Sequence, residues 1–268
     1  SASVEFTAAA GDATRLAQEA VAAGCDTVIA AGGDGTLNEV INGLAPHMDE
    51  VRVGLIPLGT GNDFAKMLNL PATPADCIEV LRAGFVQPTD VVRVTTDRVR
   101  YFVNVSAGGF SGAVNEKMTP EIKQSWGPLA YLRCAAEALP ELRAYRTEIT
   151  LDDATTLALD LYNVVIANGR YVAGGTFIAP EASITDGLLD IILIPASAAG
   201  SIALVAAQIA VGKHLASEGV VFRRAATVSV KSEPGMWFNV DGELIGNEPA
   251  RFEIMPRALQ FLTGANAV

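Results

Sequence analysis

The segment TVIAAGGDGTLNEV, residues 27–40 of this 268-residue sequence, carries the strongest indication of the fold. Residues 27–31 form an apolar run, as expected of a parallel strand that is covered on both faces. A glycine-rich turn follows at 32–36, and apolar side chains then recur at helical spacing from Leu37 to Leu44. The same order returns with an apolar strand at 53–57 and the turn GTGND at 59–63. This alternation of strand and helix predicts a parallel α/β sheet.

The pattern changes near Pro88, where short strands separated by turn residues replace the alternation. Before that point we expect an extended piece at Val4–Thr7 and helices over Asp12–Ala23, through Phe64 and Leu68, and over Pro74–Ala83. After it we expect strands at Val91–Thr95, Tyr101–Ser106, Thr147–Leu151, Leu157–Ile166, Leu188–Ile194, Thr227–Lys231 and Trp237–Val240, and helices at Pro128–Leu142 and Ser201–Val211. This second half should be mostly antiparallel.

Charge and composition exclude several classes of protein. Thirty acidic residues against nineteen basic ones give a formal net charge of −11, which argues against a general nucleic-acid binder. The three cysteines are far apart and lack the CxxC spacing of a zinc site, and two histidines are few for a histidine-rich metal site. The uncharged run 191–212 is interrupted by Pro195 and Gly200. We interpret it as a strand and a buried helix, since the remainder is too short to cross a bilayer.

Both glycine-rich turns suit a phosphate-binding site. Glycines let the backbone approach a phosphate, and the N–H groups at a helix N-terminus favour an anion. Lys66, one helical turn after Asp63, would bring a cation to the same place. Neither turn has the G-x-G-x-x-G pattern of dehydrogenases or the GK[ST] of P-loop NTPases. The alternative for the first turn is a tight connection with Asp34 as a helix cap, and for Lys66 a solvated helix face.

Four motifs in order make the chain similar to the diacylglycerol-kinase catalytic family: GGDGTLNEVINGL (32–44), PLGTGNDFAKMLNLP (57–71), TDGLLD (185–190) and NVDGE (239–243). In particular it resembles the soluble bacterial lipid kinases of that family, which also includes sphingosine and ceramide kinases. The resemblance implies an α/β nucleotide-binding lobe with a parallel sheet, like that of phosphofructokinase and NAD kinase. A mostly antiparallel β-sandwich lobe would follow, with the active site between the two.

The resemblance also implies a division of the chain. Residues 1–88 would form the nucleotide-binding lobe and residues 89–255 the β-rich lobe for the lipid substrate, with 256–268 returning to the first lobe. In the family the first strand ends in an Asn-Pro-x-Ser-Gly turn, and this chain begins after the corresponding point. We therefore expect a strand and a helix of the first lobe to be missing from the chain as given.

The resemblance further assigns residues to ATP and to a catalytic Mg²⁺. The implied nucleotide-binding residues are Thr7, Gly32, Gly33, Asp34, Gly35, Thr36, Leu37, Asn38, Glu39, Gly59, Thr60, Asn62 and Lys66. Asp34, Asp63 and Asp90 would join a water-linked network with the ion, which prefers oxygen ligands and keeps several waters. Without the resemblance, Asp90 would be interpreted as a turn residue that starts a strand.

Two further roles come from the resemblance. In NVDGE, Glu243 would take the proton from the acceptor hydroxyl as general base, with Asp241 assisting. A structural Mg²⁺ would bind the Asp186 side chain and the carbonyl oxygens of Ser183 and Leu188. The alternative at both places is an ordinary turn, because Asp-Gly is a strong turn signal.

From these motifs we expect an ATP- and Mg²⁺-dependent lipid kinase that phosphorylates diacylglycerol. It would be cytoplasmic and in peripheral, reversible contact with the inner face of the membrane, without nucleic acid as a partner. The alternatives are phosphatidylglycerol or another lipid as acceptor, an NAD kinase, and a non-catalytic lipid-binding module. A homodimer is left open.

Overall fold

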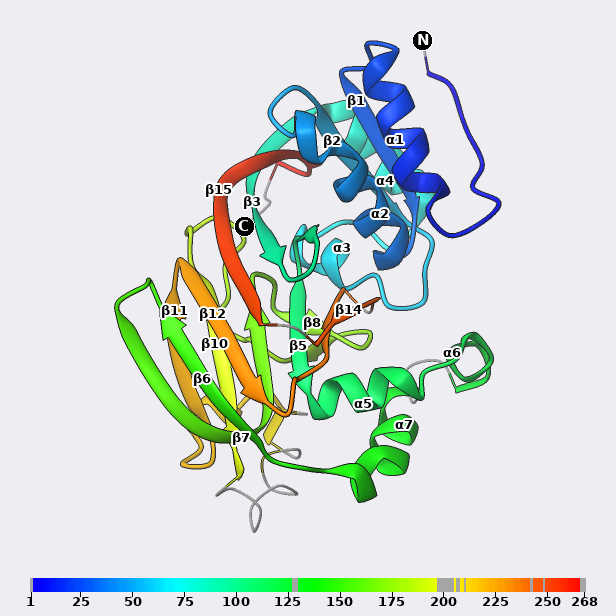
Figure 1. Ribbon diagram of the computed structural model, residues 1–268. Helices are drawn as coiled ribbons and strands as arrows, with labels where there is room; N and C mark the ends of the chain where they lie inside the picture. Colours follow the sequence, from blue (N-terminus) through cyan, green and yellow to red (C-terminus); the bar gives the residue numbers. More distant parts are fainter. Residues whose placement is uncertain are drawn as a thin grey trace.

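The computed structural model describes residues 2–126, 130–196, 205, 208–209, 211–241, 243–247 and 249–265, and the structural statements below concern these residues. Figure 1 shows one lobe built from the beginning of the chain (blue to cyan) and a second lobe built from the strands that follow. The last strand, β15 (Ala250–Thr263), runs from the second lobe back to the first.

The first lobe has the predicted alternation of strands and helices. Strands β1 (Thr27–Gly32) and β2 (Arg52–Pro57) pair in parallel along their whole length. The helices are α1 (Asp12–Ala22), α2 (Asp34–Leu44), α3 (Asp63–Met67) and α4 (Pro74–Ala83), with a 3-10 turn η1 (Ala45–His47). Because each strand leads through a glycine-rich turn into a helix, α2 and α3 begin at the same edge of the sheet. The segment Val4–Thr7 lies outside the sheet and is exposed.

The second lobe is mostly antiparallel, which confirms the predicted fold class. Its strands are β4 (Val99–Phe102), β5 (Val105–Gly109), β6 (Tyr145–Leu151), β7 (Thr155–Ala167), β10 (Leu189–Pro195), β11 (Val221–Ala225), β12 (Thr227–Glu233), β13 (Phe238–Val240) and β14 (Glu243–Gly246), besides a separate pair, β8 (Tyr171–Val172) and β9 (Thr176–Phe177). The main sheet follows the order β1-β2-β15-β12-β6-β7-β5-β13-β14, so one hydrogen-bonded path passes through both lobes.

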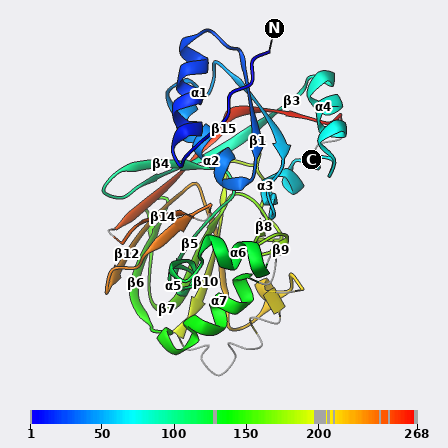
Figure 2. The ribbon, with the colours of Figure 1, turned by 90° about the vertical axis from the view of Figure 1, so that its right-hand side faces the viewer.

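Helices α5 (Phe110–Glu116), α6 (Pro120–Trp126) and α7 (Ala130–Ala138) lie together beside this sheet (Figure 2). The sequence patterns missed α5 and α6, each only seven residues long. The helix predicted at Pro128–Leu142 is instead α7 followed by a 3-10 turn, η3 (Leu139–Glu141); a third such turn is η5 (His214–Ala216). Most of the helix predicted at Ser201–Val211 lies outside the described residues. Among the described helices, none is long and apolar enough to cross a membrane.

The single strand predicted at Tyr101–Ser106 is wrong. The first part belongs to β4, which pairs with β3 (Phe85–Thr95), and the second part belongs to β5, which pairs with β7 and β13. The break is at Asn104, whose carbonyl oxygen accepts the N–H groups of Asn168 at 2.9 Å and Gly169 at 2.8 Å. The chain thus changes strand partners within a mostly apolar stretch. The hydrophobic pattern of that stretch does not show where one strand ends and the next begins.

A long ribbon of β3 and β15 joins the two lobes. The strands pair antiparallel from Arg251↔Thr95 to Thr263↔Phe85, with a register shift between Met255 and Leu259. The first half of β15 also pairs with β12, and its second half pairs in parallel with β2. Because the two halves lie in different lobes, no single alternation of apolar residues marks this strand. The sequence patterns therefore missed β15 and placed the start of β3 six residues too late.

Each half of β15 fills a different core. Phe252 packs edge-on against Phe102 and Phe238 in the second lobe. Phe261 packs against Phe64 of α3, with 5.1 Å between the ring centroids, in the core under α2 and β2. Both side chains are fully buried. The packing of β15 consequently holds each lobe in place on the other.

The Phe261 contact gives a prediction about stability. Phe261→Ala should lower the free energy of unfolding by about 3–5 kcal/mol, because it removes a buried aromatic ring and leaves a cavity. Urea unfolding followed by circular dichroism measures this loss. The control is Phe6→Ala, at a side chain that is 87% exposed, which should change the value by less than about 0.5 kcal/mol. Equal losses in the two variants would contradict the described packing.

Candidate active site

The two glycine-rich turns lie against each other. The N–H of Leu58 donates to the carbonyl oxygen of Gly32 at 2.9 Å. A Cβ atom on Gly59 would lie only 2.5 Å from the Cα atom of Gly33, so no larger residue fits there. The side chain of Asn62 closes the second turn by accepting from the N–H of Gly59 at 2.9 Å and donating to its carbonyl oxygen at 2.7 Å. The N-terminus of α2 thereby forms an edge that an anionic ligand can approach.

Asp34 fastens the first turn to the second. It is the first residue of α2, and its carboxylate accepts the N–H groups of Asp63 and Phe64, both at 3.1 Å. Burial raises the pKa of Asp34; the two backbone hydrogen bonds lower it, and the charge of Asp63 raises it again, so that the pKa lies above its ordinary value. The carboxylate that the resemblance assigns to the Mg²⁺ network therefore also caps α3.

Asp63 and Lys66 connect α3 to the turn between β8 and β9. Asp63 is buried; its Oδ1 accepts from Lys66 Nζ at 3.1 Å, and its Oδ2 accepts from the N–H of Gly174 at 3.0 Å. Lys66 Nζ also donates to the carbonyl oxygen of Gly61 at 2.8 Å. The lysine is held over the second glycine turn, which fits a role beside phosphates better than a solvated helix face.

Asp241 links the second lobe to the first. Its Oδ1 accepts the N–H of Val105 at 3.0 Å, and its Oδ2 accepts from the side-chain amide of Asn38 at 3.1 Å. Burial raises the pKa of Asp241 to about 7; the two hydrogen bonds oppose this shift, and the charge of Asp34 adds to it. The bond with Asn38 joins two motifs that lie 203 residues apart.

Two of the predicted nucleotide-binding residues, Leu37 and Glu39, make contacts within the first lobe, and their role toward a nucleotide stays a prediction. Glu39 caps α1, because its two carboxylate oxygens accept the N–H groups of Gly11 at 2.9 Å and Ala13 at 3.0 Å. Leu37 is buried in the core, and its N–H donates to the carbonyl oxygen of Gly33 at 3.1 Å. The Leu37 side chain is buried and that of Glu39 is partly buried, and both stabilise the first lobe through these contacts.

The other predicted residues of the site differ in access. Thr36 packs on Gly32, because a Cβ atom added to Gly32 would lie only 2.5 Å from Oγ1 of Thr36. Gly35 has open space around it, since a Cβ there would meet nothing within 4 Å. The remaining three are exposed: Thr7 ahead of α1, Thr60 in the second turn, and Glu243 as the first residue of β14. A ligand can therefore reach both glycine turns and Glu243 from solvent.

Asp90 is bound to other segments. It is fully buried, and its carboxylate accepts the N–H groups of Gly187 and Arg257, both at 2.7 Å. Its own N–H donates to the carbonyl oxygen of Ile184 at 2.7 Å. Asp90 thus attaches the TDG turn and the register shift of β15 to β3. Among the described residues it shares no direct hydrogen bond with Asp34 or Asp63, and the water-linked network with Mg²⁺ stays a prediction.

The residues of the predicted structural Mg²⁺ site lie in a turn with its own local hydrogen bonds. The carboxylate of Asp186 accepts the N–H of Leu188 at 3.0 Å, and the hydroxyls of Ser183 and Thr185 lie 3.2 Å apart. Among the described residues there is no group of three or more His, Cys, Asp or Glu side chains that could hold a metal ion. An ion at Asp186 would depend on backbone carbonyl oxygens and stays a prediction.

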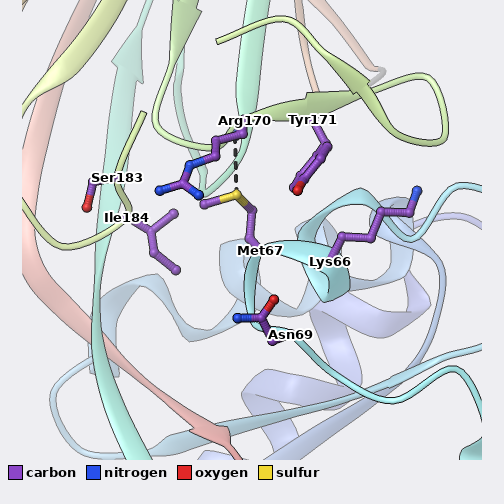
Figure 3. A pocket seen from close by; sticks show the side chains of 7 residues that line it. All are labelled: Lys66, Met67, Asn69, Arg170, Tyr171, Ser183 and Ile184. Atoms are coloured by element: carbon purple, nitrogen blue, oxygen red, sulfur yellow. Dashed lines mark hydrogen bonds between the residues drawn. The ribbon is translucent and has the colours of Figure 1, made fainter. Parts of the chain in front are cut away.

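A small cavity lies between α3 and the segment 170–184 (Figure 3). Its volume is about 30 Å³, room for about one water molecule. The lining residues are Lys66, Met67, Asn69, Arg170, Tyr171, Ser183 and Ile184. The N–H of Arg170 contacts the sulfur of Met67 at 3.3 Å, and its Nε donates to the carbonyl oxygen of Ala182 at 2.7 Å. The cavity is too small for a nucleotide, which would have to bind at the open edge of the glycine turns.

Two residues that hydrogen-bond to the site, Asn42 and Gly174, were not predicted from the sequence. Asn42 lies within the first motif and contacts Asn38, and a signal was present, because Asp34, Asn38 and Asn42 follow one another at helical spacing. Gly174 reaches Asp63 from a turn whose residues 173–175 all have positive φ. No local pattern links that turn to the first lobe, so its role could be found only from the structure.

Comparisons with known proteins give matches over both lobes of the chain. The diacylglycerol kinase catalytic domain matches residues 1–94, and the YegS C-terminal NAD kinase beta sandwich-like domain matches residues 104–263. A diacylglycerol kinase of Bacillus subtilis (strain 168) is 34% identical over 257 residues, covering 93% of this chain and 82% of that protein. The chain belongs to the diacylglycerol kinase catalytic family.

Other members of the family support the assignment. A Xanthomonas oryzae pv. oryzae protein named "Probable lipid kinase YegS-like" is 35% identical over 256 residues, covering 93% of this chain and 82% of its own length. A crystal structure of a presumed diacylglycerol kinase from Bacillus anthracis str. Sterne superposes with a TM-score of 0.82 at 25% identity, over 98% of this chain and 86% of that one. The resemblance stated from the motifs is confirmed.

Asp90, although placed in the site by the family pattern, should behave as a structural residue. Asp90→Asn sets an NH₂ group against a backbone N–H, which should lower the free energy of unfolding by about 1–3 kcal/mol in urea titrations. The control is Asp152→Asn, because the exposed Asp152 accepts the N–H groups of Ala226 and Thr227 with one oxygen and can keep both bonds. A variant at 90 as stable as the control would contradict this role.

The raised pKa of Asp241 predicts a pH dependence of stability. Between about pH 4 and 7 the folded state binds more protons at this residue than the unfolded state, so the free energy of unfolding falls as the pH rises. Asp241→Asn removes this slope. From pH 4 to 8 the stability of Asp241→Asn relative to wild type should therefore rise by on the order of 4 kcal/mol.

Urea unfolding at pH 4.5, 6 and 8 without nucleotide or metal measures this difference. The control is Asp160→Asn, at an exposed carboxylate on β7, whose difference from wild type should stay flat. If the stability difference between Asp241→Asn and wild type also stays constant across pH, the pKa of Asp241 is not raised in the folded protein.

Proposed function

We propose that the protein is an ATP-dependent lipid kinase that transfers the γ-phosphoryl group of ATP to the hydroxyl of diacylglycerol, giving phosphatidic acid. The observation that carries this proposal is the 3.1 Å hydrogen bond between Asn38 and Asp241. It joins the glycine turn of the first lobe to the Asp-Gly-Glu turn of the second. Groups suited to a triphosphate and groups suited to a hydroxyl proton thus meet at one interface. The diacylglycerol kinases among the relatives support the choice of acceptor.

In this proposal the nucleotide lies along the two glycine turns. The exposed N–H edge at the start of α2 and the ammonium of Lys66 would contact the phosphates. Lys66 can do so without a large movement, because it is half-exposed and already held over the second turn at Gly61. Thr60 and Gly35 stand at the open side of the same turns, where the sugar and phosphates would pass.

A Mg²⁺ ion fits this interface only together with the nucleotide. Burial is the main cause of the raised pKa of Asp241, and the negative charge of Asp34 adds to it, so the two carboxylates repel each other. A divalent cation would offset that repulsion, and the phosphates would supply the oxygens that the protein lacks. Asp34 and Asp241 would hold the ion, which would neutralise charge on the transferred phosphoryl group.

Glu243 is the base in this proposal. It is exposed beside Asp241 and takes the proton from the acceptor hydroxyl. The hydroxyl oxygen forms a bond to the γ-phosphorus while the bond from that phosphorus to the bridging oxygen breaks, and ADP leaves with the electron pair. Asp241 orients the turn through its bonds to Val105 and Asn38.

The acceptor is a membrane lipid, so the protein would have to meet the bilayer surface. We propose reversible, peripheral contact at the cytoplasmic face, where ATP is present. The net charge of −11 makes anionic lipid repel most of the surface, so binding should weaken as the content of anionic lipid rises.

The direct test is phosphorylation of lipids in mixed micelles by the full-length protein. Micelles carry diacylglycerol, phosphatidylglycerol, ceramide or sphingosine, and a further sample contains NAD without detergent. We expect product with diacylglycerol that requires ATP and Mg²⁺. Product with NAD alone would contradict a lipid kinase, and product with none of the acceptors would contradict the proposed activity.

Glu243→Gln tests the base. The variant should lower kcat by about 10²–10⁴-fold, since it removes the proton acceptor and keeps the shape of the side chain. The control is Glu148→Gln, at an exposed glutamate on a strand of the same lobe, which should leave kcat within about twofold. Full activity of the variant at 243 would exclude this mechanism.

A further inference from the structure

Asp34, Asn38 and Asn42 form a polar stripe along one face of α2. Their four-residue spacing places them one above another on the helix. Asp34 caps α3 and Asn38 bonds to Asp241, as described above. Asn42, a turn further from the site, has no part in the proposed chemistry. Its contacts nevertheless lead back to the site.

The side-chain amide of Asn42 pairs with both polar backbone atoms of Tyr101 on β4. The N–H of Tyr101 donates to Asn42 Oδ1 at 3.0 Å, and Asn42 Nδ2 donates to the carbonyl oxygen of Tyr101 at 2.8 Å. A flipped amide would set donor against donor and acceptor against acceptor. The backbone of Tyr101 therefore fixes the orientation of the Asn42 amide, and the pairing attaches α2 to β4.

This orientation determines that of Asn38. Asn42 Nδ2 donates to the carbonyl oxygen of Asn38 at 2.9 Å and to its side-chain Oδ1 at 3.1 Å. With Oδ1 turned toward Asn42, Asn38 Nδ2 faces the carbonyl oxygen of Tyr101 at 3.2 Å and Asp241 Oδ2 at 3.1 Å. A flipped Asn38 would present an oxygen to the carboxylate, which is repulsive.

We propose that Asn42 is a positioning residue, which acts through Asn38 by holding its amide in the one orientation that donates to Asp241. This inference rests on the proposed function, in which Asp241 orients the turn that carries the base. The contact lies between the lobes, so the amide pair also sets the distance from the glycine turn to Glu243. A misplacement of about 1 Å at such a site costs on the order of 100-fold in rate.

Two substitutions at position 42 distinguish a positioning role of the Asn42 side chain from a role in packing alone. Asn42→Ala leaves Asn38 free to adopt either orientation. Asn42→Asp keeps an acceptor for the N–H of Tyr101 but places an acceptor opposite Asn38, so Asn38 should flip and turn its oxygen to Asp241. We expect kcat for lipid phosphorylation to fall about 10-fold in the Ala variant and about 100-fold in the Asp variant, with KM for ATP within about twofold.

A double-mutant cycle tests the route through Asn38. If Asn42 acts through that residue, the variant with Ala at both 38 and 42 loses no more kcat than Asn38→Ala alone. Losses that multiply would overturn the inference, because Asn42 would then act independently. Equal kcat values for the Ala and Asp variants at 42 would overturn it as well.

Asn163→Ala is the matched control for lost stability. Asn163 is a buried asparagine on β7 whose Oδ1 accepts the N–H of Ser111 at 2.9 Å. The control should lower Tm by an amount comparable to Asn42→Ala and leave kcat within about twofold. If the control loses as much kcat as the variants at 42, the effect is general loosening of the fold and the positioning role is overturned.

A second readout does not require activity. The side-chain ¹⁵N–¹H₂ resonances of Asn38, assigned by their disappearance in Asn38→Ala, should shift when Asp241→Asn is added to the wild type. They should not shift when the same change is added to Asn42→Asp. Equal shifts in both backgrounds would overturn the inference. If the wild type phosphorylates no lipid, the proposed function fails, while this comparison still decides the role of Asn42.

Discussion

A half-buried carboxylate between two lobes needs hydrogen-bond donors, and Asp241 has them on both sides. One donor is the N–H of Val105 in its own lobe, and the other is the amide of Asn38 in the first lobe. Because burial raises the pKa of Asp241 to about 7, loss of either donor would leave the charged form still less stable. The two lobes therefore have to meet in one register, which the Asn42 pairing with Tyr101 helps to maintain.

The ribbon of β3 and β15 makes that register possible. Phe252 and Phe261 anchor the two halves of β15 in separate cores, and Asp90 secures the irregular segment between them through Arg257. A continuous pair of strands is a stiffer connection than a flexible linker. The ribbon thus fixes how the second lobe is placed against the glycine turns of the first.

The elements that the sequence predicted well are those set by local pattern. The runs at β1 and β2 and the glycine turns could be recognised because strand, turn and helix follow within about fifteen residues. β15 could not, since its apolar residues face two different cores, and neither could the change of partner at Asn104. For the site, the motifs located Asp34, Asp63 and Asp241. They did not reveal that Glu39 caps α1 or that Asp90 bonds to Gly187 and Arg257, because those partners are distant in the sequence.

In the proposed mechanism, nucleotide and acceptor meet at the interface joined by Asn38 and Asp241. A crystal structure of the protein with Mg²⁺ and a non-hydrolysable ATP analogue tests it most directly. We expect the phosphates within hydrogen-bond distance of the N–H groups at the start of α2, with the γ-phosphate on the side of Asp241 and Glu243. A nucleotide bound elsewhere, or with its γ-phosphate turned away from the second lobe, would contradict it.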